Sequence, residues 1–511
     1  MAIYSDKNKK NLFFFIIISL IIISEVLLIL FDRGLALGIT FLFFLTTIIF
    51  LLFSKLGIKN KKFYLLFIIT LLIHLGAVLF IHYANFQPFS GGGGDYILYQ
   101  RQAKEIAGRV SNGNFSLKGT EIFHYYPVII GYIYALTLPE MIVGQLFGVW
   151  LAAISAILVY LIVLEIGGSE KQAFNIGLII SVYPSYLFYG SLLLKDVLVT
   201  PLALGVLFLV IKLIKNLSWE NFLIFYIVLA SLIHFRFYIG YAVIFTFIFC
   251  WLFLSQINLS KRITYGIVMV FFLGFLPQIS GYGYFGRLTF KAYLNPETIT
   301  AYRESNYTPI NIAYNPAPYP VPSVLNSETP ISETPPPCST TPTPPSTTPT
   351  PPSTTLPTPC STTPPPPSTT PPPGAQSTIV TKTEFNKPIA FLGNYLKSFI
   401  FVLLGPFPWQ IKYERQYLAL IETIPWYVLV FFSVKEIKKS IQNYRKTLPL
   451  ILFGFGVLAV LALFTPNFGI ITRIRIPAFI SLLCAAPPNF NYSSLKNKYF
   501  NIRRKILSKV T

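Results

Sequence analysis

The sequence predicts an all-α integral membrane protein, a bundle of about twelve transmembrane helices, from three observations. The chain of 511 residues is 53% hydrophobic and only 12% charged, whereas soluble proteins are about a quarter charged. Apolar runs of about 18 residues or more recur along the whole chain, and each is long enough to cross the ~30 Å hydrocarbon layer as a helix. Lysine and arginine gather in short segments between these runs, which is typical of cytoplasmic loops.

The apolar runs define the expected order of spans. Nine spans precede a long polar insert, at 12–31, 35–53, 63–83, 140–164, 173–191, 193–214, 221–235, 238–256 and 263–280. Three follow it, at 415–433, 448–465 and 474–488. The apolar stretch 389–408 is expected to lie in the outer interface or to dip in and out. A further span there would move the basic segment 434–446 to the outside.

The distribution of the charges predicts the orientation. Basic segments lie where an N-terminus inside the cell places inner loops, at 7–10, 54–62, 260–262, 434–446 and the tail 489–511. Both termini are therefore predicted to be cytoplasmic, in a multi-pass protein of the cell membrane. The net charge of +21 does not indicate a nucleic-acid partner, because the basic residues are spread over these loops. We expect membrane lipid to surround the protein.

This topology divides the chain into five parts. Two N-terminal helices (1–62) precede a transmembrane core (63–280) whose long outer loop spans 84–139. An extracytoplasmic loop follows (281–388), then a C-terminal transmembrane region with an outer interfacial helix (389–488) and the basic tail (489–511). The tract rich in Pro, Thr and Ser in 281–388 has too few apolar side chains for a core and is predicted to be disordered. Whether Cys338 and Cys360 in that tract pair is left open.

Four cations lie where spans meet at the predicted outer face, namely Lys195, Arg236, Arg473 and Arg475. One interpretation is that they extend to lipid headgroups. The other is that they converge with nearby polar side chains into a site, since charges at this depth are costly. Those side chains are Asp95, Asp196, His124 and His234. Arginine forks and a lysine ammonium suit a phosphate at headgroup depth, so this interpretation predicts a lipid-linked phosphate as ligand.

The outer loop 84–139 begins with four glycines, residues 91–94, followed by Asp95. Apolar side chains then recur at helical spacing, which predicts an amphipathic helix over 96–110 on the outer surface: Tyr99, Ala103, Ile106, Ala107 and Val110. Asp95 suits a helix N-cap, and it equally suits a carboxylate that accepts a proton from an attacking hydroxyl. The two roles are compatible.

These features resemble the GT-C glycosyltransferases, in particular family 39 and the group similar to aminoarabinose transferases. The resemblance lies in "GGGGDYILYQRQA", in "IFHYYPVIIGYIYAL" (122–136) and in the run from "VGQLFGVW" to "YGSLLLKD". It implies transfer of a sugar from a polyprenyl-phosphate donor to a glycan, lipid or protein acceptor, with inversion at the anomeric carbon. By the same likeness Asp95 is the catalytic base, and Lys195, Arg236, Arg473 and Arg475 hold the donor phosphate.

Supporting roles are expected for Asp196, His124 and His234, which lie on the same side as the cations, and for Tyr99 on the buried side of the predicted helix. No residue pattern requires a cofactor, and a divalent cation between Asp95 and the phosphate stays open. The four histidines lack metal-ligand spacing, so no metal site is predicted.

Three other functions remain as alternatives. An oligosaccharide polymerase or ligase of the O-antigen type would use the outer arginines without a catalytic aspartate. A transporter would use carboxylates within spans, and Glu25 and Glu422 are such residues, although no inverted repeat is evident. A non-catalytic surface-anchoring protein would use the Pro/Thr tract as a stalk.

Overall fold

The computed structural model describes residues 24–84, 95–117, 120, 125–279, 299, 387–410, 420–427, 444–464 and 468–485. Within these ranges every regular element is a helix. Several predictions fall outside them: most of the first span, the glycines 91–94, His124, the Pro/Thr tract with Cys338 and Cys360, and the tail 489–511.

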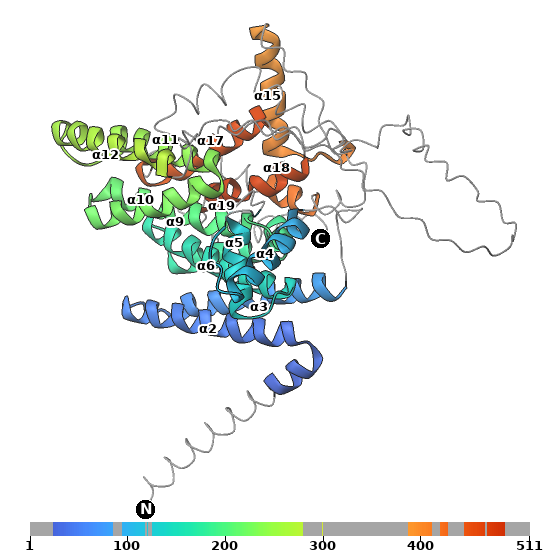
Figure 1. Ribbon diagram of the computed structural model, residues 1–511. Helices are drawn as coiled ribbons and strands as arrows, with labels where there is room; N and C mark the ends of the chain where they lie inside the picture. Colours follow the sequence, from blue (N-terminus) through green and yellow to red (C-terminus); the bar gives the residue numbers. More distant parts are fainter. Residues whose placement is uncertain are drawn as a thin grey trace, which may run out of the picture. The chain divides into compact units, whose positions relative to one another are not determined.

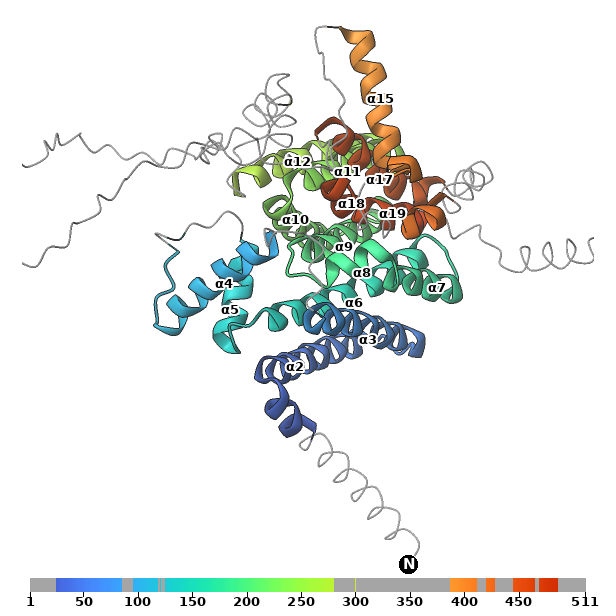
Figure 2. The ribbon, with the colours of Figure 1, turned by 90° about the vertical axis from the view of Figure 1, so that its right-hand side faces the viewer.

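Six of the described helices are long and apolar enough to cross a membrane. They are α2 (Arg33–Lys55), α3 (Lys61–Tyr83), α6 (Met141–Glu165), α9 (Asp196–Lys215), α11 (Phe237–Leu254) and α17 (Tyr444–Phe464). α2 and α3 pack on α6, α6 on α9, and α11 on both α9 and α17, an order that Figures 1 and 2 let the reader follow. The prediction of an all-helical, multi-pass membrane protein is confirmed at this level.

Three further helices pack on these six. α10 (Trp219–Phe235) lies between α9 and α11, and α12 (Leu259–Ile279) packs on α10 and α11. α15 (Pro388–Leu404), in the stretch predicted to be interfacial, packs on α17.

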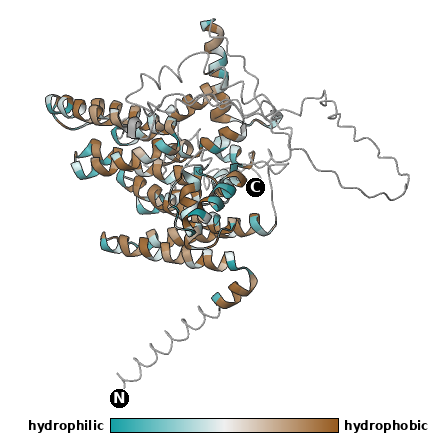
Figure 3. Cartoon of the chain, viewed as in Figure 1, coloured by the Kyte–Doolittle hydropathy of each residue, from teal (hydrophilic) through white to brown (hydrophobic). Residues whose placement is uncertain are grey.

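The outward faces of these helices are apolar. Figure 3 shows hydrophobic residues along most of their length. Large side chains such as Phe43, Phe245 and Phe253 are more than half exposed. Apolar surface of this extent is stable only against lipid or another protein, so these faces fit a hydrocarbon environment.

One predicted span is interrupted, which corrects its prediction as a single helix. The span at 173–191 is divided into α7 (Glu170–Ser181) and α8 (Pro184–Gly190). Pro184 has no N–H to donate and disfavours helical backbone in the residue before it. The span predicted at 474–488 contains one helix, α19 (Ile476–Ala485), and a short helix, α18 (Phe468–Ile474), precedes it. Pro477, which has no N–H to donate, lies beside the break between these two helices.

The helix predicted over 96–110 is present. α4 (Asp95–Ser111) buries the apolar side predicted for 96–110, with Tyr99, Ala103, Ile106 and Ala107 inside. It packs closely on α5 (Tyr126–Leu136). A Cβ atom at Gly131 would lie 2.6 Å from Ile106, so the glycine permits this close approach of the two helices.

The bundle has two ends with different chemistry. α9 begins at Asp196 and ends at Lys215, whose Nζ lies 3.3 Å from Glu165. Lys62, in the basic segment 54–62, lies 3.4 Å from Glu170 at that same end. Because α9 has 20 residues, this basic end lies about 30 Å from Asp196, which is close to the hydrocarbon thickness of a bilayer.

Candidate functional site

A chain of alternating charges lies at the end of α9 that is opposite the basic end. Arg236 Nη2 is 2.7 Å from Asp196 Oδ1, and Arg473 Nε is 2.9 Å from Asp196 Oδ2. Arg473 Nη1 donates to Asp95 Oδ2 at 2.8 Å. Asp196 therefore bridges two guanidinium groups, and Arg473 bridges two carboxylates. With Lys195, these residues are called the charged cluster below.

Four separate parts of the chain supply the charged cluster. Asp95 is the first residue of α4, and Asp196 the first residue of α9. Arg236 is the single residue between α10 and α11. Arg473 lies in the last turn of α18, 378 positions from Asp95. Each side chain thus lies at or near a helix end, where backbone N–H or C=O groups are free to interact with ligands.

Lys195 is buried beside the ion pair of Asp196 and Arg236, with 5% of its surface exposed. Burial, then repulsion from Arg236, holds the pKa of its ammonium well below the usual lysine range, against attraction from Asp196. A lysine in such a place can lose its charge far more readily than one in water. Its charge is therefore sensitive to any anion that enters the cluster.

The charged cluster contains three cations and two carboxylates, so its formal net charge is +1. Its carboxylates are exposed to different degrees: 48% of the Asp95 side chain is exposed and 9% of that of Asp196. Asp95 and the Arg473 group that it binds therefore form the accessible side. A ligand that arrives there and carries negative charge would complete the charge balance.

Two tyrosines line the cluster. Burial and the Asp95 carboxylate raise the pKa of Tyr99 above its usual range, which places its hydroxyl near the charges. The ring of Tyr126 lies 5.8 Å from that of Tyr99. The Tyr126 hydroxyl is fully buried and has no hydrogen-bond partner among the described residues. An unsatisfied buried hydroxyl is unusual and is often found where a ligand or water binds.

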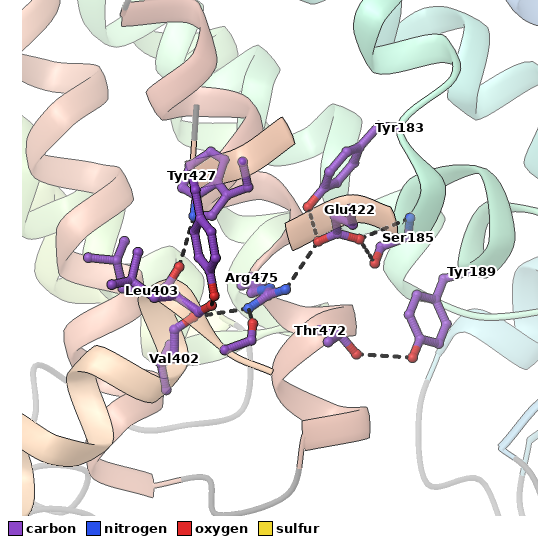
Figure 4. A network of polar contacts seen from close by, with 12 residues as sticks. Tyr183, Ser185, Tyr189, Val402, Leu403, Glu422, Tyr427, Thr472 and Arg475 are labelled. Atoms are coloured by element: carbon purple, nitrogen blue, oxygen red, sulfur yellow. Dashed lines mark hydrogen bonds and ion pairs between the residues drawn. The ribbon is translucent and has the colours of Figure 1, made fainter. Parts of the chain in front are cut away.

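The structure places Arg475 apart from the charged cluster. Its guanidinium is 1% exposed and lies 3.1 Å from Glu422 Oε1. It also donates to the carbonyls of Val402 and Gly405, at 3.2 and 2.6 Å. Figure 4 shows this network, in which Tyr183 and Ser185 also donate to Glu422. Arg475 was predicted to bind phosphate, but in this structure its Nη1 and Nη2 groups donate to protein acceptors.

The other predicted site residues have separate surroundings. His234 lies in the last turn of α10, two residues before Arg236, and its ring centroid is 4.0 Å from that of Tyr125. His124 lies outside the described residues. Across the described part of the chain, no three His, Cys, Asp or Glu side chains gather as metal ligands. Glu25 accepts a hydrogen bond from Thr40 at 2.6 Å.

Two features of the site differ from their prediction. Asp196 was assigned a supporting role, although it contacts both arginines of the cluster. Its position directly after Lys195 and at a helix start was the available signal. The partner of Arg475 was missed too. Glu422 was noted as a carboxylate within a span, and such a charge requires a partner of opposite sign.

The chain was compared with known proteins at three levels. No family model, no curated protein and no solved structure matches it. The geometry of the charged cluster, together with the resemblance in the sequence, therefore carries the functional proposal.

Proposed function

We propose that the protein is a GT-C-like membrane glycosyltransferase that uses a polyprenyl-phosphate-linked sugar at the extracytoplasmic face. The observation that carries the proposal is the charged cluster: Arg473 joins the exposed Asp95 to the buried Asp196 and Arg236. A base and an anion site adjoin there, about 30 Å from the basic end of α9. Transfer from a phosphate donor to a hydroxyl requires both groups side by side.

The proposed reaction is a single displacement. The acceptor hydroxyl oxygen forms a bond to the anomeric carbon while the bond from that carbon to the phosphate oxygen breaks. The acceptor proton passes to Asp95, and the electron pair of the broken bond leaves with the phosphate. Arg473, Lys195 and Arg236 stabilise the charge that develops there. Attack opposite the leaving group inverts the anomeric centre.

An exchange of the anion bound to Arg473 would link donor binding to catalysis. Asp95 Oδ2 accepts a hydrogen bond from Arg473 Nη1. A donor phosphate that binds Arg473 replaces this contact and leaves the Asp95 carboxylate available to the acceptor. A divalent cation between Asp95 and the phosphate remains compatible with this step.

The proposal includes a twelve-span topology in the cell membrane with both termini cytoplasmic. The basic segments 54–62 and 260–262 and the tail 489–511 would then face the cytoplasm, and the charged cluster would face outward. The segment 281–388 would be an extracytoplasmic insert. The acceptor is a glycan, a lipid or a protein.

Sugar transfer in isolated membranes tests the proposal. Membranes that contain the protein are supplied with polyprenyl phosphates carrying labelled sugars, beside membranes with an equal amount of folded Asp95→Asn. Transfer that depends on Asp95 supports a monomer-transferring enzyme. Equal transfer by both proteins favours the polymerase or ligase alternative, in which the cluster binds a lipid-linked glycan and needs no carboxylate base.

A transporter is the second candidate, because two interrupted helices meet at one buried charge pair. Tyr183 and Ser185, at the break between α7 and α8, contact Glu422, and Arg475, at the break between α18 and α19, binds the same carboxylate. Interrupted helices often surround transport sites. Against this candidate, the pair is 1% exposed on each side. Solute exchange across vesicles that Glu422→Gln abolishes would favour it.

A further inference from the structure

The buried pair Glu422–Arg475 joins four parts of the chain that are far apart in sequence. Glu422 accepts hydrogen bonds from Tyr183 and Ser185, at the break between α7 and α8. Arg475 donates to Val402 and Gly405 at the end of α15. The contacts drawn in Figure 4 connect the two charges to these other parts of the chain. A buried ion pair is expensive to break by removing one partner, because the other charge is left unpaired.

The helical stretch 420–427, which carries Glu422, is itself fixed on both sides. The Trp426 ring stacks on Phe479 of α19 at a centroid distance of 3.7 Å, and its Nε1 donates to Leu403 at 2.8 Å. Tyr427 donates to Leu404 at 2.6 Å. The Arg475 guanidinium lies 4.5 Å from the same Phe479 ring. Glu422 is therefore a rigid acceptor rather than a mobile side chain.

Arg475 lies two residues after Arg473 of the charged cluster, between α18 and α19. The Arg475 N–H donates to the Ile471 carbonyl at 3.0 Å, as in a helical turn. Two positions along such a turn differ by about 200° in direction, so side chains at 473 and 475 extend to opposite sides of the chain. Arg473 contacts Asp95 and Asp196 on one side, and Arg475 contacts Glu422 on the other. Thr472 adds a contact of 3.1 Å to Tyr189 of α8.

The short helix α18 needs such external contacts. It has seven residues, too few for a helix to be stable by itself. Its orientation, and with it the position of the Arg473 guanidinium, is therefore set by what holds its ends.

We infer that Glu422 and Arg475 form a positioning pair, which holds α18 so that Arg473 reaches Asp95 and Asp196. Arg475 acts through Arg473 and does not itself touch the donor. This inference rests on the proposed function where it concerns phosphate binding. The fixing of α18 is independent of that function.

The first test measures binding of a fluorescent short-chain polyprenyl phosphate by protein in phosphatidylcholine nanodiscs, expressed per folded protein. Arg475→Gln should weaken binding about tenfold or more by displacing Arg473. The double variant Glu422→Leu with Arg475→Met removes both charges and fills the space with apolar atoms. It should bind within about threefold of wild type, because an apolar pair often replaces a buried ion pair without loss.

The double variant decides between the two roles of Arg475. If Arg475 bound the phosphate, the double variant would bind as weakly as Arg475→Gln, and the positioning role would be overturned. Arg262→Gln is the matched control. It removes guanidinium contacts to the carbonyls of Leu252, Ser255 and Ile257 between α11 and α12, and it should leave phosphate binding unchanged.

Hydrogen exchange of the peptide 468–474 separates the positioning role from the proposed function. Exchange there should be faster in Arg475→Gln and in Glu422→Gln and slow again in the apolar double variant. If wild type binds no polyprenyl phosphate, the proposed function fails, while this exchange pattern still supports the positioning pair. Unchanged exchange in both single variants would overturn the positioning pair, whatever the protein binds.

Discussion

Among the cations of the charged cluster, Arg473 is predicted to contribute most to donor binding. Arg473→Gln removes its guanidinium charge. Its side chain is 16% exposed, and one of its two carboxylate partners lies at the open side of the cluster. A hydrogen bond to a charged group contributes about 1.5–3 kcal/mol. At about 1.4 kcal/mol for each factor of ten, the variant should bind polyprenyl phosphate about 10- to 150-fold more weakly. Arg473→Lys should lose less affinity than Arg473→Gln, because lysine keeps the positive charge although it lacks the forked guanidinium donors.

Asp95→Asn should change binding in the opposite direction. Asp95 competes with the phosphate for Arg473 Nη1, and the pair is half-exposed on the Asp95 side. An ion pair of this exposure contributes about 0.2–1 kcal/mol. Its loss should therefore tighten phosphate binding by about 1.4- to 5-fold. Asp196 is buried and bridges Arg236 as well, so it is expected to remain in place when the phosphate binds.

Both effects are measured with a fluorescent polyprenyl phosphate and protein in neutral nanodiscs at two salt concentrations. Arg109→Gln is the control, since Arg109 lies in α4 with Asp95 but pairs with Glu105 on the exposed side of that helix, at 3.2 Å. Binding by Arg473→Gln that equals wild type would refute the phosphate site. Binding by Asp95→Asn that is much weaker than wild type would refute the exchange of partners at Arg473.

Three further predictions concern the surroundings of the cluster. Because the pKa of Lys195 lies well below its usual range, its ammonium is lost early as pH rises; phosphate binding should therefore fall with rising pH, and Lys195→Arg should remove this fall in a pH titration. Gly131→Ala should lower the melting temperature in detergent by overpacking worth about 1–3 kcal/mol, since its Cβ would meet Ile106; Gly108→Ala, which meets nothing within 4 Å, should not lower it. Tyr126→Phe removes a buried hydroxyl without a partner among the described residues, so the melting temperature should not fall; a clear fall would show that this hydroxyl is bonded.

The features that are local in sequence were predictable. α4 is bounded by Asp95 and Ser111, within one residue of the predicted 96–110, because an amphipathic repeat directly reports the buried side of a helix. The ends of the long spans were predictable within a few residues, since hydrocarbon thickness fixes their length. The location of Lys195, Arg236 and Arg473 at span ends also followed from the sequence.

The features that depend on packing between distant segments were not predictable. Nothing local distinguishes Arg473 from Arg475, yet one contacts Asp95 and the other Glu422, because the direction of each side chain depends on where α18 ends. The division of 173–191 at Pro184 had a local signal, but its strong hydropathy favoured one continuous span. The bridging role of Asp196 required knowledge that α10, α11 and α18 meet at the start of α9.

The central claim is that Asp95 acts in the chemical step and not in holding the donor. The most direct measurement is the rate of sugar transfer by Asp95→Asn at a donor concentration that saturates binding, beside wild type and Arg109→Gln. Loss of a general base should slow transfer by about 10²- to 10⁴-fold while the donor remains bound, and Arg109→Gln should transfer at the wild-type rate. Transfer by Asp95→Asn at the wild-type rate, with donor bound, would contradict the account.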